Sequence, residues 1–284
     1  MTFTLTWTLA RAEATKLTDA ITEWASSDMT EMADGRWNVT AYFDARPDDT
    51  ALGAASEFAI GTRKLPPIKK LADEDWVAKS LTALAPVQAG RYLVHGSHDR
   101  DRAPVNAVTI EIDAATAFGT GHHGTTAGCL TALSELAKRK QVCNALDVGT
   151  GSGVLAIAAA KTWRIPVLAT DIDPIAVEIA RDNARLNEVA AHVRTIRAPG
   201  MRHPLLRRSN AFDLVTANIL ARPLSDLAPK IANAVAPGGT VILSGLLPGQ
   251  RRWIVGSYRN NGLTFRRAMV RDGWLTLELQ KPSG

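Results

Sequence analysis

Three glycines mark the segment of the chain that is best suited to hold a ligand. Gly149, Gly151 and Gly153 follow the short apolar run Ala145–Val148 and precede a run of small apolar residues, which predicts a strand, a tight turn and a helix. Glycine lets the backbone turn sharply and approach a ligand closely, and the start of a helix offers free N–H groups. The segment therefore predicts a binding site where a strand ends.

An acidic residue follows at the end of the next expected strand. Asp171 comes directly after Val167–Thr170 and lies 22 residues beyond Gly149. A carboxylate at this place can accept hydrogen bonds from ribose hydroxyls, and Ile172 beside it can pack on an adenine ring. The glycines and the acid together predict a site for an adenosine-containing cofactor; a tight turn without a ligand is the alternative.

The glycine spacing distinguishes between two such cofactors. Dinucleotide enzymes use the pattern G-x-G-x-x-G, whereas Gly149–Gly153 has the pattern G-x-G-x-G. NAD also carries a pyrophosphate that needs the helix N-terminus. S-adenosylmethionine (SAM) has no phosphate, and its amino-acid end needs a polar partner such as Asp147. We therefore expect SAM, and keep a nicotinamide oxidoreductase as the rival class.

A second glycine-rich segment, Ala117–Thr126, precedes the expected helix Ala127–Leu136. Its glycines, threonines and histidines suggest a loop folded over a ligand. His122 and His123 are adjacent, but no helical i, i+4 histidine pair and no neighbouring carboxylate completes a metal site. We therefore expect no metal.

Asn218 follows another expected strand, Phe212–Ala217. Loops at the carboxyl ends of strands are the places where α/β folds put ligand-contacting residues. Asn218 is therefore a candidate site residue, and the alternative for it alone is a helix or turn cap.

The elements that carry these residues alternate strand and helix along the second part of the chain. Repeated strand–helix units build a parallel sheet with helices on both faces. The end differs, because Leu263–Val270 and Trp274–Leu279 are joined by Asp272-Gly273, a dipeptide typical of a hairpin turn. We therefore expect an α/β domain over residues 113–284 that closes with an antiparallel hairpin.

The first 90 residues show a different order of elements. Their pattern predicts strand, helix, strand, strand, helix and strand, which is the order of a ferredoxin-like α+β domain. The expected elements are Phe3–Leu9, Arg11–Trp24, Met29–Ala33, Arg36–Phe43, Pro47–Ile60 and Arg63–Leu71. Residues 91–112 are expected to link the two domains.

The composition agrees with two folded domains. The chain has 284 residues, of which 46% are hydrophobic and 21% charged. No apolar run approaches the roughly 20 residues that span a bilayer, and the first residues lack the pattern of a secretory signal. With two cysteines, a disulfide framework or a four-cysteine zinc site is excluded. We expect a cytoplasmic protein without a membrane partner.

Charge is distributed unevenly between the two parts. Residues 1–90 hold 9 Lys and Arg against 13 Asp and Glu, whereas residues 91–284 hold 24 against 15. An acidic first part can meet a basic partner such as a ribosomal protein, and chance variation on solvated faces is the alternative. The arginines between 194 and 208 are scattered through an expected loop without interleaved aromatic residues, which argues against direct nucleic-acid contact.

Taken together, the motifs resemble the ribosomal protein methyltransferases of the PrmA family, which modify the eleventh protein of the large ribosomal subunit. The similar segments occur in the order of the family between residues 118 and 275: Phe118–Gly121 with Thr125-Thr126, Asp147–Gly153, Asp171–Pro174, Asn218–Ala221, Ser244–Leu247 with Gln250, and Gly273–Leu275. Gly124 stands where many members have proline, and the first domain offers no motif that can be matched residue by residue.

The resemblance implies a seven-stranded, Rossmann-like, SAM-dependent methyltransferase domain with a separate substrate-recognition domain. Carried over by position, Thr126, Gly149, Asp171 and Asn218 contact the cofactor, and Gly151 joins them because it belongs to the glycine turn. Asn218 is also the candidate for orienting the acceptor, a lysine or N-terminal amine of the ribosomal protein. The alternatives are a lysine methyltransferase of a metabolic protein and a ribosome-assembly binder without catalysis.

Overall fold

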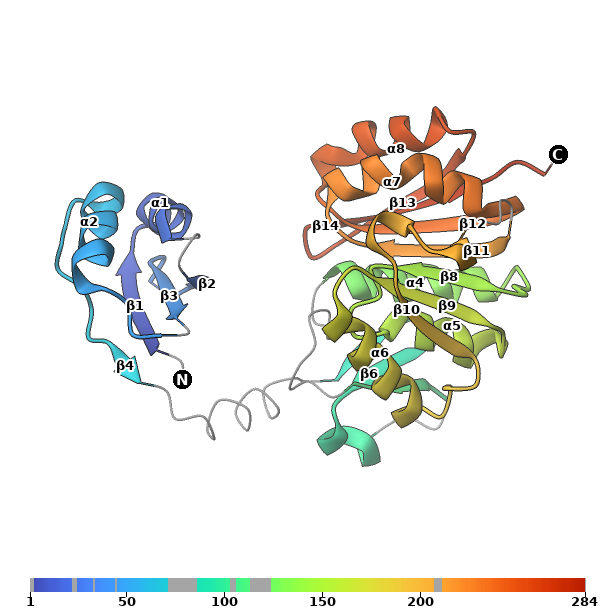
Figure 1. Cartoon of the computed structure of the whole chain (residues 1–284), viewed down its shortest axis with the longest axis horizontal. Coiled ribbons are helices and arrows are strands. Elements are labelled where there is room, and N and C mark those ends of the chain that lie inside the picture. The colour runs from blue at the N-terminus through green and yellow to red at the C-terminus, as the bar shows by residue number, and fades with distance from the viewer. Residues whose placement is uncertain are drawn as a thin grey trace. The chain divides into compact units, whose positions relative to one another are not determined.

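The computed structural model describes residues 3–21, 25–32, 34–43, 45–70, 86–102, 106–112, 124–206 and 211–283. The chain divides into two compact units, Met1–Ser80 and Leu81–Gly284 (Figure 1). In the described part of the chain, no helix combines the length and the apolar character that a membrane crossing requires.

The first unit contains one four-stranded sheet and two helices. Its strands lie in the order β2-β3-β1-β4, and every neighbouring pair is antiparallel. Chain order is β1 (Phe3–Leu9), α1 (Arg11–Ile21), β2 (Ser26–Glu31), β3 (Trp37–Phe43), α2 (Asp49–Ile60) and β4 (Lys69–Lys70). Of the last expected strand, Arg63–Leu71, only Lys69–Lys70 is a strand among the described residues, and Leu71 lies outside them.

Period-two alternation explains why the sheet of the first unit has one buried face. Leu5 and Trp7 of β1 are paired with Ala41 and Val39 of β3, and all four side chains are buried in the same core. Helix α2 begins at a cap in which the Asp48 carboxylate accepts hydrogen bonds from two backbone N–H groups. Local signals and burial therefore agree in this unit.

The expected linker, residues 91–112, is instead part of the second unit. Strands β5 (Val87–Ala89), β6 (Tyr92–His95) and β7 (Val108–Glu111) form a small sheet, with the 3-10 helix η1 (Ser97–Arg102) between the last two. Tyr92 and Ile110 are fully buried in the core of that unit. The linker prediction was wrong because such short strands reveal their partners only through tertiary packing.

A hydrogen-bonded pair ties this small sheet to a distant helix. The side chain of Asn187 donates to the backbone O of Glu111 at 2.6 Å and accepts from its N–H at 2.9 Å. The Tyr92 hydroxyl lies 2.7 Å from Thr162 Oγ1. Residues 86–112 therefore belong to the packed body of the second unit.

The main sheet of the second unit has the strand order β10-β9-β8-β11-β12-β14-β13. Strands β8 to β12 pair in parallel, whereas β14 runs antiparallel to both of its neighbours. Their bounds are β8 (Ala145–Val148), β9 (Val167–Asp171), β10 (Val193–Arg197), β11 (Phe212–Asn218), β12 (Val235–Leu246), β13 (Thr264–Arg271) and β14 (Trp274–Gln280). The closing hairpin expected from Asp272-Gly273 is present, and both residues have positive φ.

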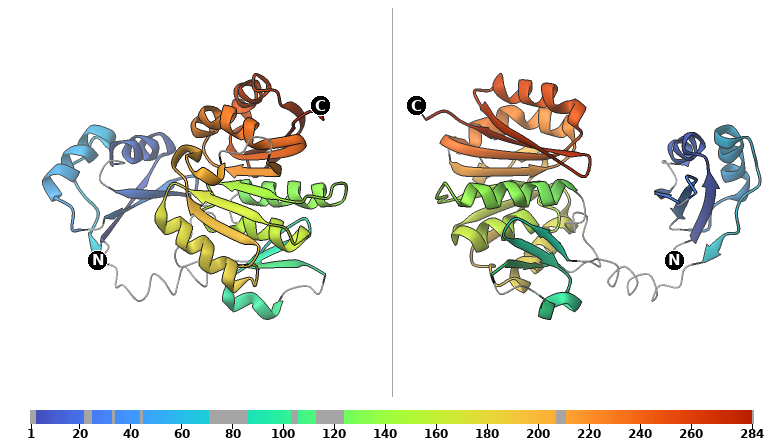
Figure 2. Two further views of the ribbon diagram at one scale, coloured as in Figure 1. Left: turned by 45° about the vertical axis from the view of Figure 1, so that its right-hand side comes forward. Right: turned by 180° about the vertical axis from the view of Figure 1, so that it is seen from behind.

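Helices cover both faces of this sheet, as the figures show (Figure 2). One core contains side chains of α4 (Gly124–Ala137), α5 (Val154–Trp163) and α6 (Pro174–Leu186). The core on the other face contains side chains of α7 (Ala221–Ala234) and α8 (Arg251–Arg259). Short 3-10 turns, η2 (Pro199–Met201), η3 (Pro204–Leu206) and η4 (Pro248–Gln250), complete the chain path.

The arginines near residue 194 were expected in a loop, and this expectation was wrong for two of them. Arg194 and Arg197, which we expected in a loop, lie on β10. The signal was weak because β10 alternates apolar residues with arginine and threonine. Residues 74–84, for which the sequence pattern also predicts a helix, lie outside the described residues.

Helix α4 approaches β14 so closely that only glycine fits at the crossing. A Cβ atom on Gly128 would overlap Thr276 Oγ1. The Thr276 side chain is 3% exposed and lies 3.1 Å from Ser244 Oγ. Gly128 is therefore a packing requirement of the sheet that carries the site.

Gly128→Ala is expected to lower the free energy of unfolding by about 1–2 kcal/mol because of this overlap, although alanine is normally the better helix residue by about 1 kcal/mol. Gly256→Ala is the matched control, since nothing lies within 4 Å of a Cβ on that helical glycine. It should raise stability by about 0.5–1 kcal/mol. Urea unfolding of both variants measures the difference, and equal signs would contradict the close approach.

Candidate functional site

The loop from Gly149 to Gly153, called the glycine loop below, connects β8 to the start of α5. All three of its glycines have positive φ, at 70°, 52° and 84°, a region that residues with a Cβ rarely adopt. A Cβ on Gly149 would overlap Ile219 Cγ2. The turn therefore requires glycine because of its positive φ angles. Gly149 is also required because Ile219, which follows β11, packs closely against it.

Asp171 ends β9 beside this loop and is bound to it directly. Its Oδ2 accepts a hydrogen bond from Gly151 N at 2.9 Å, and Oδ1 accepts from Asp173 N at 3.1 Å. A carboxylate has about four lone-pair positions, so each oxygen keeps capacity for another donor. The Asp171 carboxylate is thus oriented by the glycine loop, together with which it was predicted to bind a cofactor.

A cavity of about 420 Å³ opens at the carboxyl ends of β8 and β11. It is lined by the glycine loop, by the first turns of α4 and α5, by the segment after β11 and by the start of β14. Four of the five predicted site residues, Thr126, Gly149, Gly151 and Asn218, line it. Asp171 is not among its lining residues and is connected to it through Gly151.

Asn218 ends β11, and its amide is oriented by α4. Nδ2 donates to Thr125 Oγ1 at 3.3 Å and to Thr126 Oγ1 at 3.2 Å. Among the residues that the structure describes, none donates to Asn218 Oδ1. The two threonines therefore fix the amide so that its acceptor oxygen stays available.

Asp147 lies beneath the glycine loop, 1% exposed. Thr150 Oγ1 and Thr216 Oγ1 each donate to its carboxylate at 2.6 Å. Burial raises the pKa of Asp147 to about 6, and the charge of nearby Asp171 acts in the same direction, whereas the two hydroxyls oppose the shift. The carboxylate is therefore held in place by hydrogen bonds at an electrostatic cost.

Apolar residues that sequence reasoning did not assign to the site also line the cavity. Trp274 comes from the start of β14, and Ile219 and Leu220 follow Asn218. Leu220 is 70% exposed, which is unusual for a leucine. The sequence offered one signal, since Asn218–Ala221 and Gly273–Leu275 both belong to the family resemblance. Neither motif, however, shows that side chains of the two segments line the same cavity.

Part of the second glycine-rich segment lies outside the described residues. This applies to 117–123, including His122 and His123, whereas Thr125 and Thr126 are described and line the cavity. Within the described ranges, no three His, Cys, Asp or Glu side chains are grouped closely enough to hold a metal.

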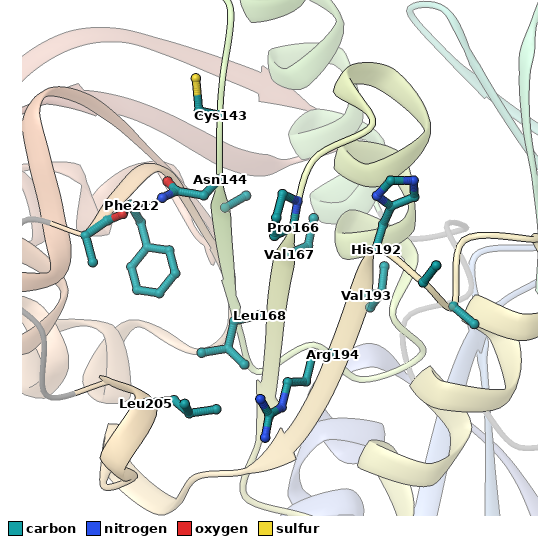
Figure 3. A pocket seen from close by; sticks show the side chains of 14 residues that line it. Cys143, Asn144, Pro166, Val167, Leu168, His192, Val193, Arg194, Leu205 and Phe212 are labelled. Atoms are coloured by element: carbon teal, nitrogen blue, oxygen red, sulfur yellow. Dashed lines mark hydrogen bonds between the residues drawn. The ribbon is translucent and has the colours of Figure 1, made fainter.

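A larger groove of about 500 Å³ lies at the opposite ends of the strands of the same sheet (Figure 3). It is lined at the amino ends of β8, β9, β10 and β11, with Leu168, Arg194 and Phe212 among its side chains. Open α/β sheets bind ligands at the carboxyl ends of their strands. The smaller cavity, which the glycine loop lines, is therefore the candidate site.

The buried carboxyl group predicts a pH-dependent stability. The folded pKa of Asp147, about 6, lies above the value of about 3.9 in an unfolded chain. Its contribution to stability is thus complete below about pH 4 and is lost as the pH rises through 6. Relative to Asp147→Asn, the wild-type free energy of unfolding should fall by about 2–3 kcal/mol between about pH 4 and pH 7. Urea unfolding of both proteins over this range measures it, and a difference independent of pH would contradict the shift.

Comparisons with known proteins agree with this geometry. The family profile described as "Ribosomal protein L11 methyltransferase (PrmA)" matches residues 4–282. A ribosomal protein L11 methyltransferase of Mesorhizobium japonicum is 50% identical over 234 residues, which cover 82% of this chain and 81% of the relative. One of Rhizobium meliloti is 54% identical over 211 residues, covering 74% of this chain and 72% of the relative.

A solved structure shows the same similarity in three dimensions. The chain in the crystal structure of ribosomal protein L11 methylase from Lactobacillus delbrueckii subsp. bulgaricus is 31% identical and superposes with a TM-score of 0.61. The match covers 70% of this chain and 100% of that chain. The resemblance inferred from the sequence motifs is confirmed by these matches. The chain belongs to the ribosomal protein L11 methyltransferase (PrmA) family.

Proposed function

We propose that this chain is a SAM-dependent methyltransferase that transfers methyl groups to lysine side-chain or N-terminal amines of ribosomal protein L11. The observation that carries the proposal is the convergence of Thr126, the glycine loop and Asn218 on one cavity in a chain of this family. SAM, when bound, supplies an electrophilic methyl group on a positively charged sulfur.

The cavity fits a cofactor of this kind. Cβ atoms would collide with Ile219 at both Gly149 and Gly245, so these glycines let the segment after β11 pack directly on the glycine loop and form one wall of the cavity. Asp171 has acceptor positions left for ribose hydroxyls, and hydrogen bonds to an ionised carboxylate are stronger than those between neutral groups. We assign cofactor contact to Thr126, Gly149, Gly151, Asp171 and Asn218.

Asn218 is the residue that we assign to the acceptor amine. With Nδ2 bound to the two threonines, Oδ1 can accept a hydrogen bond from a neutral amine and align its lone pair without adding charge. Positioning of this kind accounts for a large share of the barrier lowering in transfer reactions.

The apolar lining favours the neutral form of the acceptor. A free lysine has a pKa of about 10.4 and an α-amine about 8. Ile219, Leu220 and Trp274 line the cavity, and desolvation beside them disfavours an ammonium ion. No lining residue in the described part of the chain is an acid, a histidine or a lysine, so the proton leaves to water.

We assign substrate recognition to the first unit, within the predicted domain 1–90. Its β-α-β-β-α-β order and antiparallel strand order β2-β3-β1-β4 support a ferredoxin-like domain. Its excess of acidic residues, 13 against 9 basic ones over residues 1–90, suits a basic ribosomal protein. The seven-strand order of the second unit supports the SAM-dependent methyltransferase fold, and a cytoplasmic location follows from the proposed substrate.

A labelling experiment tests the function. Purified chain, SAM with a radiolabelled methyl group and ribosomal protein L11 should give label in the L11 band, whereas L11 with acetylated amines should stay unlabelled. SAM binding without transfer would indicate an assembly binder, and label on another protein of a fractionated lysate but not on L11 would indicate a different substrate. Binding of NADH in preference to SAM would contradict the cofactor assignment.

Two substitutions at the site should separate binding from turnover and serve as controls for each other. Asp171→Ala should weaken SAM binding by about 1–3 kcal/mol, because a charged hydrogen-bond acceptor is lost. Asn218→Ala should lower kcat about 10- to 100-fold through misplacement of the amine, with a smaller loss of SAM affinity. Calorimetry with SAM and initial rates with L11 measure both. Unchanged SAM affinity in the first variant or an unchanged kcat in the second would contradict the assigned roles.

A further inference from the structure

One long segment of the second unit carries only positive charge. No Asp or Glu occurs between Asp226 and Asp272, whereas this segment holds Lys230 and six arginines. All six arginines fall within residues 251–271, which form α8 and β13. An excess of one sign over such a stretch produces a local positive potential.

Two of the six arginines are engaged in the structure of the unit. Arg267 Nε donates to the buried Glu278 carboxylate at 2.7 Å. Arg271 lies 3.6 Å from Asp272 and donates to the backbone O of Gln88. Both guanidinium groups are thus occupied by contacts within the unit, so we do not count them as available to a binding partner.

The other four arginines, Arg251, Arg252, Arg259 and Arg266, are exposed. We call them the arginine face. Within the described residues none of them forms an ion pair with a carboxylate; Arg266 donates to the amide oxygen of Gln280 at 2.7 Å, and Arg251 lies over the Phe265 ring at 4.8 Å. No described carboxylate therefore neutralises their charges.

The arginine face is distributed over α8 and β13, the terminal strand in the sheet order. Arg252 and Arg259 are seven residues apart on α8, which places them on the same side of the helix. The Arg251 guanidinium lies over the ring of Phe265 in β13, and Arg266, the next residue of that strand, is directed toward Gln280. In Figure 1, both elements lie toward the red end of the colour scale.

Stability of the helix does not explain these arginines. Arg251 and Arg252 stand in the first turn of α8, where the helix dipole disfavours positive charge, and no acidic residue is present there to offset it. Trp253 between the arginines and the buried Ile254 is 48% exposed. Exposed guanidinium groups beside an exposed indole are the combination that binds phosphates and stacks on bases.

We propose that the arginine face binds the phosphate backbone of single-stranded RNA, with Trp253 stacking on a base. Guanidinium groups match phosphate oxygens in pairs, and a nucleobase offers a ring for Trp253 to stack on, whereas an anionic lipid surface offers none. This proposal departs from the expectation drawn from the arginines between 194 and 208, because those lie elsewhere. It does not depend on the methyl transfer proposed above.

Fluorescence anisotropy of the full chain with a labelled, unstructured RNA of about 20 nucleotides tests the proposal. Four phosphate contacts on a single strand predict a slope of log K against log salt of roughly −3, hence a loss of about 50-fold between about 50 and 200 mM salt. Arg252→Gln with Arg259→Gln should weaken binding at least about tenfold at low salt and halve the slope.

The controls separate the arginine face from total charge. Arg181→Gln with Arg185→Gln removes two arginines from the exposed side of α6, where each is paired with an acid, and should leave RNA binding unchanged. Trp253→Ala should weaken binding about fivefold or more without a change of slope. Absence of RNA binding at low salt, equal losses in the two double variants, or equally tight binding of polyglutamate or of vesicles with an anionic phospholipid would overturn the proposal.

Discussion

A buried carboxylate organises the site on which the rest of the second unit depends. Asp147 on β8 accepts hydrogen bonds from Thr150 in the glycine loop and from Thr216 on β11, and its backbone oxygen accepts one from Thr170 on β9. One residue thus connects three neighbouring strands and the loop at the edge where the cavity opens. Hydrogen bonds to an ionised group are stronger than neutral ones, which offsets part of the desolvation cost that raises its pKa.

Close backbone approach is the second constraint on this edge. The glycine loop meets Ile219 after β11, and Gly245 on β12 packs against the backbone of the same residue. Because neither glycine has a side chain, Ile219 packs directly against both, and the segment that follows Asn218 can pass over the loop. This explains why the loop, Asn218 and Leu220 line one cavity although they come from opposite halves of the sheet.

Sequence reasoning performed best where a signal was local. The glycine turn, the acid at the end of the next strand, the asparagine after β11 and the hairpin at Asp272-Gly273 each depend on a few adjacent residues, and the structure shows all four in place. It did not reveal that the short strands in residues 91–112 pack against α4 and α5, which come later in the chain. It also missed α8, because the arginines that cover its outer side hide the buried pair Ile254 and Tyr258.

The amino-acid sequence by itself determined the family, the strand and helix order around the glycine loop, and the candidate residues for a cofactor site. Backbone freedom, charge and short-range spacing are properties of neighbouring residues, so they can be read directly along the chain. Only the tertiary structure decided that Thr125 and Thr126 orient Asn218, that Trp274 joins the cavity and that Arg251 of α8 lies over Phe265 of β13. These relations join residues far apart in the chain, and they arise from packing that no local pattern encodes.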